Sequence, residues 1–126
     1  MDTKQLNKPE LQIMKCLWEI DKGFLKDIVE QFPEPKPAYT TISTLLGRMC
    51  DKGYVGFEKL GRDKRYFPLL KKNVYSTAQI KSVINNFFNG SPTLFASYFT
   101  KNTDLSIEEL KDLKGLLEEE IKSKKE

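Results

Sequence analysis

Hydrophobic residues recur at three- and four-residue steps in the first part of the chain, and this spacing predicts three helices. The first covers residues 8–20, where Asn7 can cap the N-terminus and Gly23 is suited to a left-handed C-terminal cap. The second covers residues 25–31 and ends at a proline-rich segment, because proline lacks the backbone donor that a helix needs. The third covers residues 38–52.

Two alternating runs of polar and apolar residues, 54–60 and 64–69, lie on either side of Gly61. Aromatic and β-branched residues around a glycine turn are typical of a β-hairpin. Three helices followed by a hairpin is the element order of a winged helix-turn-helix, in which the hairpin is the wing.

Helical spacing returns after residue 73, and Ser106 with Glu109 forms a capping box that opens the last helix. The apolar residues of this tail exceed what a short helical segment can cover within one chain, which favours burial across a twofold axis. The sequence therefore predicts a mainly α protein. Residues 1–72 form a winged helix-turn-helix (three helices plus a β-hairpin wing), and residues 73–126 form a helical dimerisation domain. The residues expected in the core of the homodimer are Ile84, Phe87, Phe88, Leu110, Leu113 and Leu117.

The polar face of the third predicted helix carries short hydroxyl side chains and one arginine, whereas an ordinary solvated face would carry Glu and Lys. Short hydrogen-bonding side chains allow a helix to lie deep in the major groove of DNA, where they meet base edges and phosphates. Tyr39, at the start of this helix, either packs or bonds a phosphate through its hydroxyl. The candidate DNA-binding residues of the helix are Tyr39, Thr40, Thr41, Ser43, Thr44 and Arg48.

Positive charge is concentrated around the same helix. The whole chain has a net charge of +3, but residues 36–72 contain nine Lys or Arg against three Asp or Glu. The predicted hairpin tip contributes Arg62, Lys64 and Arg65, which are expected to contact phosphates beside the groove that the helix enters. Taken singly these charges could be solubilising, and their clustering at one tip favours a DNA-binding face.

The residue inventory argues against catalysis. The chain has no histidine, and Cys16 and Cys50 lack the spacing of metal ligands. Imidazole bases, Ser–His or Cys–His nucleophile pairs and common zinc sites are thereby excluded, and we expect no enzyme, no metal and no cofactor. The start of the chain lacks the build of a secretory signal, and no apolar run is long enough to span a bilayer. A cytoplasmic protein without membrane insertion is therefore expected.

Two functions from different classes remain open on these grounds. The first is a transcriptional repressor that binds double-stranded DNA. The second is a winged-helix adaptor whose basic segment mediates protein–protein contacts with an acidic partner. The salt dependence of binding to duplex DNA separates them, because DNA binding releases counterions.

Four blocks of the sequence, 10–18, 38–55, 61–69 and 105–113, carry a resemblance to one known family. Through them nearly the whole chain resembles the penicillinase repressors of bacteria, which include the methicillin-resistance repressors. The resemblance implies a homodimeric winged-helix repressor that binds a palindromic operator, with an N-terminal DNA-binding domain and a helical C-terminal dimerisation domain.

The resemblance also implies a mode of regulation. In the antibiotic-responsive members, a membrane-bound sensor protease leads to a cut in the helical tail before an Asp-Leu-Ser segment. The segment 104–106 has this sequence here, so the implied cleavage site is the Tyr98–Phe99 bond. Phe99 matches the family pattern, whereas those members have asparagine in place of Tyr98. A copper-responsive branch carries paired cysteines near its C-terminus, and here no cysteine follows Cys50, so that metal switch is not implied.

Overall fold

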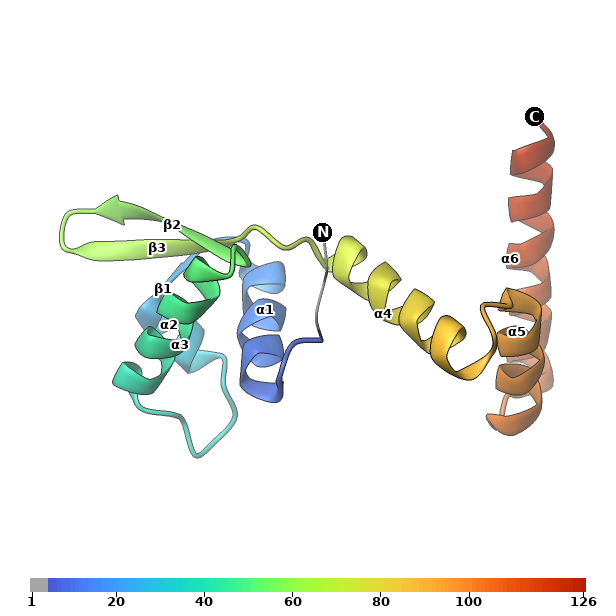
Figure 1. Ribbon diagram of the computed structural model, residues 1–126, viewed down its shortest axis with the longest axis horizontal. Helices are drawn as coiled ribbons and strands as arrows, with labels where there is room; N and C mark the ends of the chain where they lie inside the picture. Colours follow the sequence, from blue (N-terminus) through green and yellow to red (C-terminus); the bar gives the residue numbers. More distant parts are fainter. Residues whose placement is uncertain (1–4) are drawn as a thin grey trace. The chain divides into compact units, whose positions relative to one another are not determined.

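The computed structural model describes residues 5–126, and the chain divides into two compact units, one reaching to Gln79 and one from Ile80 to Glu126 (Figure 1). Helix α4 carries the chain from the first unit into the second. The predicted class, a mainly α chain with a winged helix-turn-helix, is confirmed. The elements in chain order are α1 (Lys8–Ile20), β1 (Gly23–Phe24), α2 (Leu25–Glu30), α3 (Tyr39–Asp51), β2 (Val55–Leu60), β3 (Asp63–Pro68), α4 (Lys72–Phe87), α5 (Pro92–Asn102) and α6 (Ile107–Lys125).

The sheet of the N-terminal unit has three antiparallel strands in the order β1-β3-β2. Strands β2 and β3 form the predicted wing, with Phe57 opposite Tyr66 and Lys59 opposite Lys64. Sequence patterns do not reveal β1, because its two residues become a strand only by pairing with β3. This pairing joins the wing to the residues that lead into α2.

The end of α1 differs from the prediction. Asp21, and not Gly23, adopts a positive φ of 70°, and its N–H donates to the carbonyl of Leu17 at 2.8 Å. Gly23 begins β1, where an added Cβ would lie 2.5 Å from Cδ1 of Ile20. The glycine therefore permits a close approach of the Ile20 side chain and does not act as a left-handed cap.

The core of the N-terminal unit is built from the apolar faces of α1, α2 and α3 and from the base of the wing. Truncating one of its fully buried side chains to alanine typically costs about 2–5 kcal/mol. Because α3 turns its apolar residues into this core, its opposite face is left for solvent. The fully buried large side chains are Ile13, Met14, Leu17, Ile28, Ile42, Leu46, Met49 and Val55.

The segment between the wing and α4 is fastened to the N-terminal unit. Nε1 of Trp18 donates to the carbonyl of Leu70 at 2.8 Å, and the hydroxyl of Tyr75 accepts from the N–H of Leu6 at 2.9 Å. Tyr75 is 7% exposed and lies beside Trp18. The first turns of α4 thus belong to the N-terminal unit, so the compact unit extends beyond the predicted boundary after residue 72 and reaches Gln79.

In the C-terminal unit, neither α5 nor α6 has a buried residue. Phe88, which follows α4, contacts α5, with ring centroids 5.6 Å from Phe95 and 5.4 Å from Tyr98. Asn89 and Gly90, which follow α4, both have positive φ, at 52° and 73°.

The predicted capping box of α6 is confirmed, since the Ser106 hydroxyl accepts from the Glu109 N–H while the Glu109 carboxylate accepts from the Ser106 N–H. Among residues 5–126, no helix is long and apolar enough to cross a membrane.

Candidate nucleic-acid interface

The polar face of α3 is exposed along its whole length. Ile42, Leu46 and Met49 are buried and Leu45 is half-buried. The residues predicted to contact DNA are all exposed, and except for Tyr39, which is at the first turn on the side of Ile42, they lie on the opposite side: Thr40, Thr41, Ser43, Thr44 and Arg48. The segregation follows from helical periodicity, because the two sets of residues fall on different sides at 3.6 residues per turn.

No acidic side chain stands on this helix before its last residue, Asp51. The Thr44 hydroxyl donates to the Thr40 carbonyl at 2.9 Å. The hydroxyl oxygen can still accept a hydrogen bond from an outside partner, and the methyl group of Thr44 remains free for an apolar contact. A face of this kind offers hydrogen bonds and small apolar contacts without repelling phosphate.

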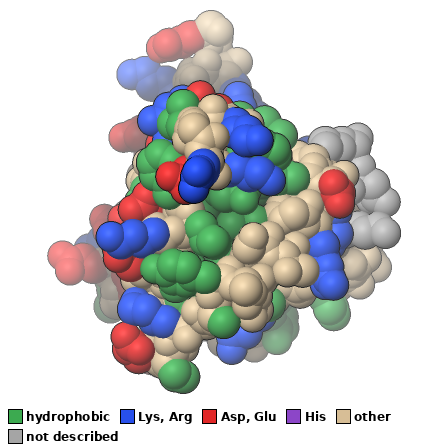
Figure 2. Space-filling model, turned by 90° about the vertical axis from the view of Figure 1, so that its left-hand side faces the viewer, with side chains coloured by type: hydrophobic (Ala, Val, Ile, Leu, Met, Phe, Trp, Pro, Cys, Tyr) green, Lys and Arg blue, Asp and Glu red, His purple; other side chains and the backbone are tan. Residues whose placement is uncertain are grey.

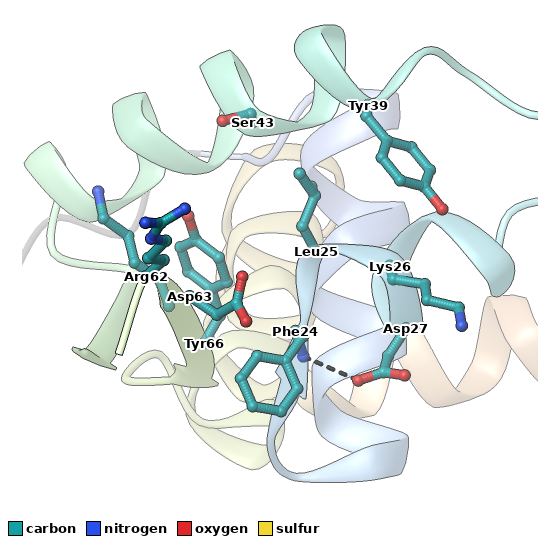
Figure 3. Close-up of a pocket in the computed structure, with 10 residues that line it drawn as sticks. Phe24, Leu25, Lys26, Asp27, Tyr39, Ser43, Arg62, Asp63 and Tyr66 are labelled. Carbon is teal, nitrogen blue, oxygen red and sulfur yellow. Dashed lines mark hydrogen bonds between the residues drawn. The ribbon is translucent and has the colours of Figure 1, made fainter. Parts of the chain in front are cut away.

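A hollow of about 570 Å³ lies between α2, α3 and the wing, and we call it the wing groove (Figure 3). Its floor is largely apolar, and its rim carries cations from two elements, Lys26 from α2 and Arg62 and Lys64 from the wing. The Asp27 carboxylate in its wall accepts from the N–H of Phe24 at 2.9 Å and so serves to cap α2. The lining residues are Phe24, Leu25, Lys26, Asp27, Tyr39, Ser43, Arg62, Asp63, Lys64 and Tyr66.

A second hollow, of about 550 Å³, lies on the other flank of α3 next to the start of α1. Thr40, Thr41, Thr44 and Arg48 line it, together with Asn7, Pro9, Phe32, Pro37, Ile42 and Leu45. The exposed face of α3 therefore stands between two depressions. Because the surface is lower on both sides of α3, the helix projects from it and can enter a groove of DNA.

The wing places its three predicted cations differently. Arg62 lies in the turn next to Gly61, which has a φ of 65°. The Lys64 Nζ lies 4.5 Å from the centroid of the Phe57 ring, a cation–π contact that orders the chain without neutralising its charge. Both side chains remain exposed.

Arg65 is held in an ion pair across the hairpin. Its Nε donates to Oε1 of Glu58 at 2.7 Å, and its Nη2 contacts the same oxygen. Lys22 approaches that oxygen at 3.7 Å. The hydrogen bonds from Arg65 hold the pKa of the Glu58 carboxyl below its usual range. Arg65 was predicted at the hairpin tip, and it lies instead within β3 with a carboxylate partner.

Figure 2 shows the face that carries the wing and α3, with Lys and Arg side chains spread around a central area of hydrophobic ones. Exposed or half-exposed apolar residues of this unit include Phe24, Leu25, Tyr39, Phe57 and Leu60. Sequence reasoning did not associate Phe24, Leu25 and Lys26 with the interface, because only the pairing of β1 with β3 brings the start of α2 beside the wing.

Comparison with known proteins identifies the family. Residues 6–119 match the family model described as penicillinase repressor. The chain belongs to the penicillinase repressor family. It is 30% identical over 123 residues to the penicillinase repressor of Bacillus licheniformis, covering 97% of this chain and 96% of that one. It is 25% identical over 120 residues to the methicillin resistance regulatory protein MecI of Staphylococcus aureus, covering 93% and 98%. A solved structure titled "CopR Repressor Structure" is 32% identical, with a TM-score of 0.45, over 54% of this chain and 100% of that chain.

Membership of the penicillinase repressor family confirms that the chain is not an enzyme, because the family consists of transcriptional repressors. Burial raises the pKa of the Cys16 thiol to about 11 and also raises the pKa of Cys50. Both thiols thus stay protonated at neutral pH and act as small apolar side chains. Within the described part of the chain, His, Cys, Asp and Glu form no group suited to a metal ion.

Proposed function

We propose that the protein is a homodimeric transcriptional repressor that binds a palindromic DNA operator through α3 and the wing. The observation that carries the proposal is the exposed face of α3, which has hydroxyls and an arginine and no carboxylate before Asp51. Membership of the penicillinase repressor family supports it. On this view Thr40, Thr41, Ser43 and Thr44 contact base edges, while Tyr39, Arg48 and the wing cations contact phosphates.

The exposed apolar residues of the C-terminal unit support a homodimer. Phe87 is 76% exposed, Leu117 is 64% exposed and Leu110 is 39% exposed, whereas Ile84, Phe88 and Leu113 are half-buried. Leu110, Leu113 and Leu117 recur at helical steps on one side of α6. Exposed apolar residues in such number are typical of an interaction site, and a second copy of the same unit offers the same residues to cover them.

The function is tested by binding to a duplex selected by the protein from a random-sequence library. Anisotropy of the labelled duplex, measured over a range of salt concentrations, reports the affinity. A repressor that contacts several phosphates gives a steep linear fall of log K with log salt, about 0.9 per contact. Binding that is absent, or indifferent to salt, would reject DNA as the ligand and favour the adaptor with an acidic protein partner.

We further propose inactivation by proteolysis at the Tyr98–Phe99 bond through a sensor protease. The two side chains are 57% and 36% exposed, but the bond is inside α5, so this helix has to unwind locally before a protease can hold the chain in extended form. A cut there would remove α6 from each chain. Linkage of two half-site contacts through a dimer raises avidity by ~10²–10⁴-fold, so the cut could empty the operator without touching a DNA contact.

Mass spectrometry of the protein recovered from induced cells tests this route. A fragment ending at Tyr98 is expected together with release of the operator. Full-length chain alone, recovered while the operator is demonstrably free, would reject proteolysis and favour a ligand or partner acting on the intact protein.

A further inference from the structure

The wing groove has cations at both ends. In Figure 3 the Lys26 and Tyr39 side chains lie at one end of the hollow, and Arg62 of the wing lies at the other. Leu25 and Ser43 lie between them. Lys26 is exposed, and within residues 5–126 neither Lys26 nor Arg62 has an ion-pair partner. Two unneutralised cations on separate elements thus flank one open, largely apolar trough.

The acidic groups in the groove do not cancel these cations. Asp27 accepts a hydrogen bond from the N–H of Phe24 at the start of α2. Asp63 is opposite Leu60 next to the wing turn, where Arg62 and Lys64 are its sequence neighbours. Three cations therefore face two carboxylates, one of which is engaged in capping. The local field favours an anion.

The shape and chemistry of the groove suit a chain of phosphates better than a single one. Its cations are separated by the apolar surface of Leu25 and Phe24 and by the hydroxyl of Ser43. A nucleic-acid backbone presents the same alternation, with charged phosphates joined by apolar sugars. The groove also adjoins the exposed face of α3, so a strand in it would be continuous with the duplex that α3 reads.

We infer that the wing groove holds one backbone strand of the DNA, and that Lys26 of α2 is a phosphate-contacting residue opposite the wing. The inference rests on the proposed function. It adds a DNA contact on α2, an element that neither the periodicity of α3 nor the charge of the wing associates with DNA binding. The strand would be gripped from both sides, by Lys26 with the Tyr39 hydroxyl at one end and by Arg62 with Lys64 at the other. This grip fixes how far α3 enters the adjacent groove.

The test compares Lys26→Gln with Lys15→Gln on the library-selected duplex. Lys15 is an exposed lysine of α1 that does not line the groove, so its substitution removes the same charge without the contact. Lys26→Gln is expected to reduce the slope of log K against log salt by about 1.8 for the dimer, because each of its two chains loses one phosphate contact, and Lys15→Gln to leave it near that of the wild type. Unchanged thermal melting of both variants, which is expected for exposed lysines, shows that folding is intact.

A second measurement locates the contact. Neutral methylphosphonate linkages are placed one at a time along the duplex. At the contacted phosphate, the linkage weakens the wild type but causes no further loss in Lys26→Gln, because the pair is already broken. Equal slopes for Lys26→Gln and wild type, with a reduced slope for Arg62→Gln, would overturn the inference and leave the proposed function standing. A wild type that fails to bind the duplex would overturn both.

Discussion

Glu10 is the buried charged side chain of the described core. Its carboxylate accepts from the Asn7 N–H at 3.0 Å and from Lys52 Nζ at 2.8 Å, which joins the start of α1 to the end of α3. Burial alone raises the pKa of this carboxyl, but the hydrogen bonds outweigh it and the pKa is lowered. A group whose pKa is lower in the folded state stabilises the fold above its unfolded pKa, and this contribution is lost as pH falls through the folded pKa.

We therefore predict that Glu10→Gln lowers the free energy of unfolding by about 1–3 kcal/mol at neutral pH, since Lys52 loses its charged partner and a buried group is imperfectly satisfied. The deficit should shrink below about pH 4, where the wild-type carboxylate also becomes protonated. Urea unfolding at both pH values measures it, with Glu19→Gln on the exposed side of α1 as control. A deficit that stays constant with pH would contradict the conclusion that the ionised Glu10 carboxylate stabilises the fold.

Arg62 and Arg65 should contribute unequally to DNA binding. Both were expected to contact phosphates, but Arg65 has its charge balanced by Glu58 across the hairpin, whereas Arg62 has no such partner within residues 5–126. Arg62→Gln is predicted to reduce the slope of log K against log salt by about 1.8 for the dimer, because each of its two chains loses one phosphate contact, and Arg65→Gln to reduce it by less. Equal reductions in the anisotropy titration would mean that Arg65 leaves Glu58 when DNA binds.

At the scale of single residues, the sequence predicted which side chains of α3 are exposed, because the helical period of 3.6 residues determines which side of the helix each residue occupies. It did not predict the pairing of Arg65, because that depends on the register that sets Glu58 opposite Arg65. Lys26 was missed for a similar reason. Its place beside the wing depends on the pairing of β1 with β3, which is about forty residues away along the chain. Such a pairing depends on closing a long loop, and no local sequence pattern reveals it.

Among the elements, helix bounds agree with prediction within a residue or two wherever the signals are local. The predicted capping residues Asn7 and Ser106 start α1 and α6, and α3 ends at Asp51, one residue before the predicted end. The extension of the N-terminal unit into α4 was not predictable in this way. It results from the contacts of Tyr75 and Trp18 with residues far away in the sequence.

Helix α6 contains a glycine on its polar side. An added Cβ at Gly115 meets nothing within 4 Å. Because glycine in a helix interior loses more backbone entropy than alanine, we predict that Gly115→Ala stabilises the C-terminal unit by about 0.5–1 kcal/mol. Thermal melting by circular dichroism measures the change. A destabilised variant would indicate that another chain approaches the helix closely at this glycine.

At the scale of the whole molecule, two adjacent phenylalanines allow the proposed dimer contacts to be tested separately from contacts within the chain. Phe87 is 76% exposed in the single chain, whereas Phe88 packs against Phe95 and Tyr98. Phe87→Ala is predicted to weaken the dimer by about 1–2 kcal/mol, as for a central interface aromatic, while the helical content is retained. Phe88→Ala should instead lower the melting temperature of the C-terminal unit itself.

Sedimentation equilibrium measures the association of Phe87→Ala, and thermal melting by circular dichroism measures the effect of Phe88→Ala. If Phe87→Ala associated like the wild type, the exposed surface of the C-terminal unit would have some other partner. The sequence predicted that apolar side chains in the tail outnumber what one chain can bury, and α5 and α6 do leave theirs unburied. Which of them face a second copy depends on an interface between chains, and stays a prediction.

The central claim is that two copies of this chain bind one palindromic duplex through α3 and the wing. Native mass spectrometry of the protein with the library-selected palindrome, and with a duplex carrying only one half-site, tests it most directly. We predict two chains on the palindrome with no populated single-chain complex, and an affinity higher than that for the half-site duplex by ~10²–10⁴-fold, because the two contacts are linked. A single chain per palindrome, or equal affinity for the two duplexes, would contradict the account.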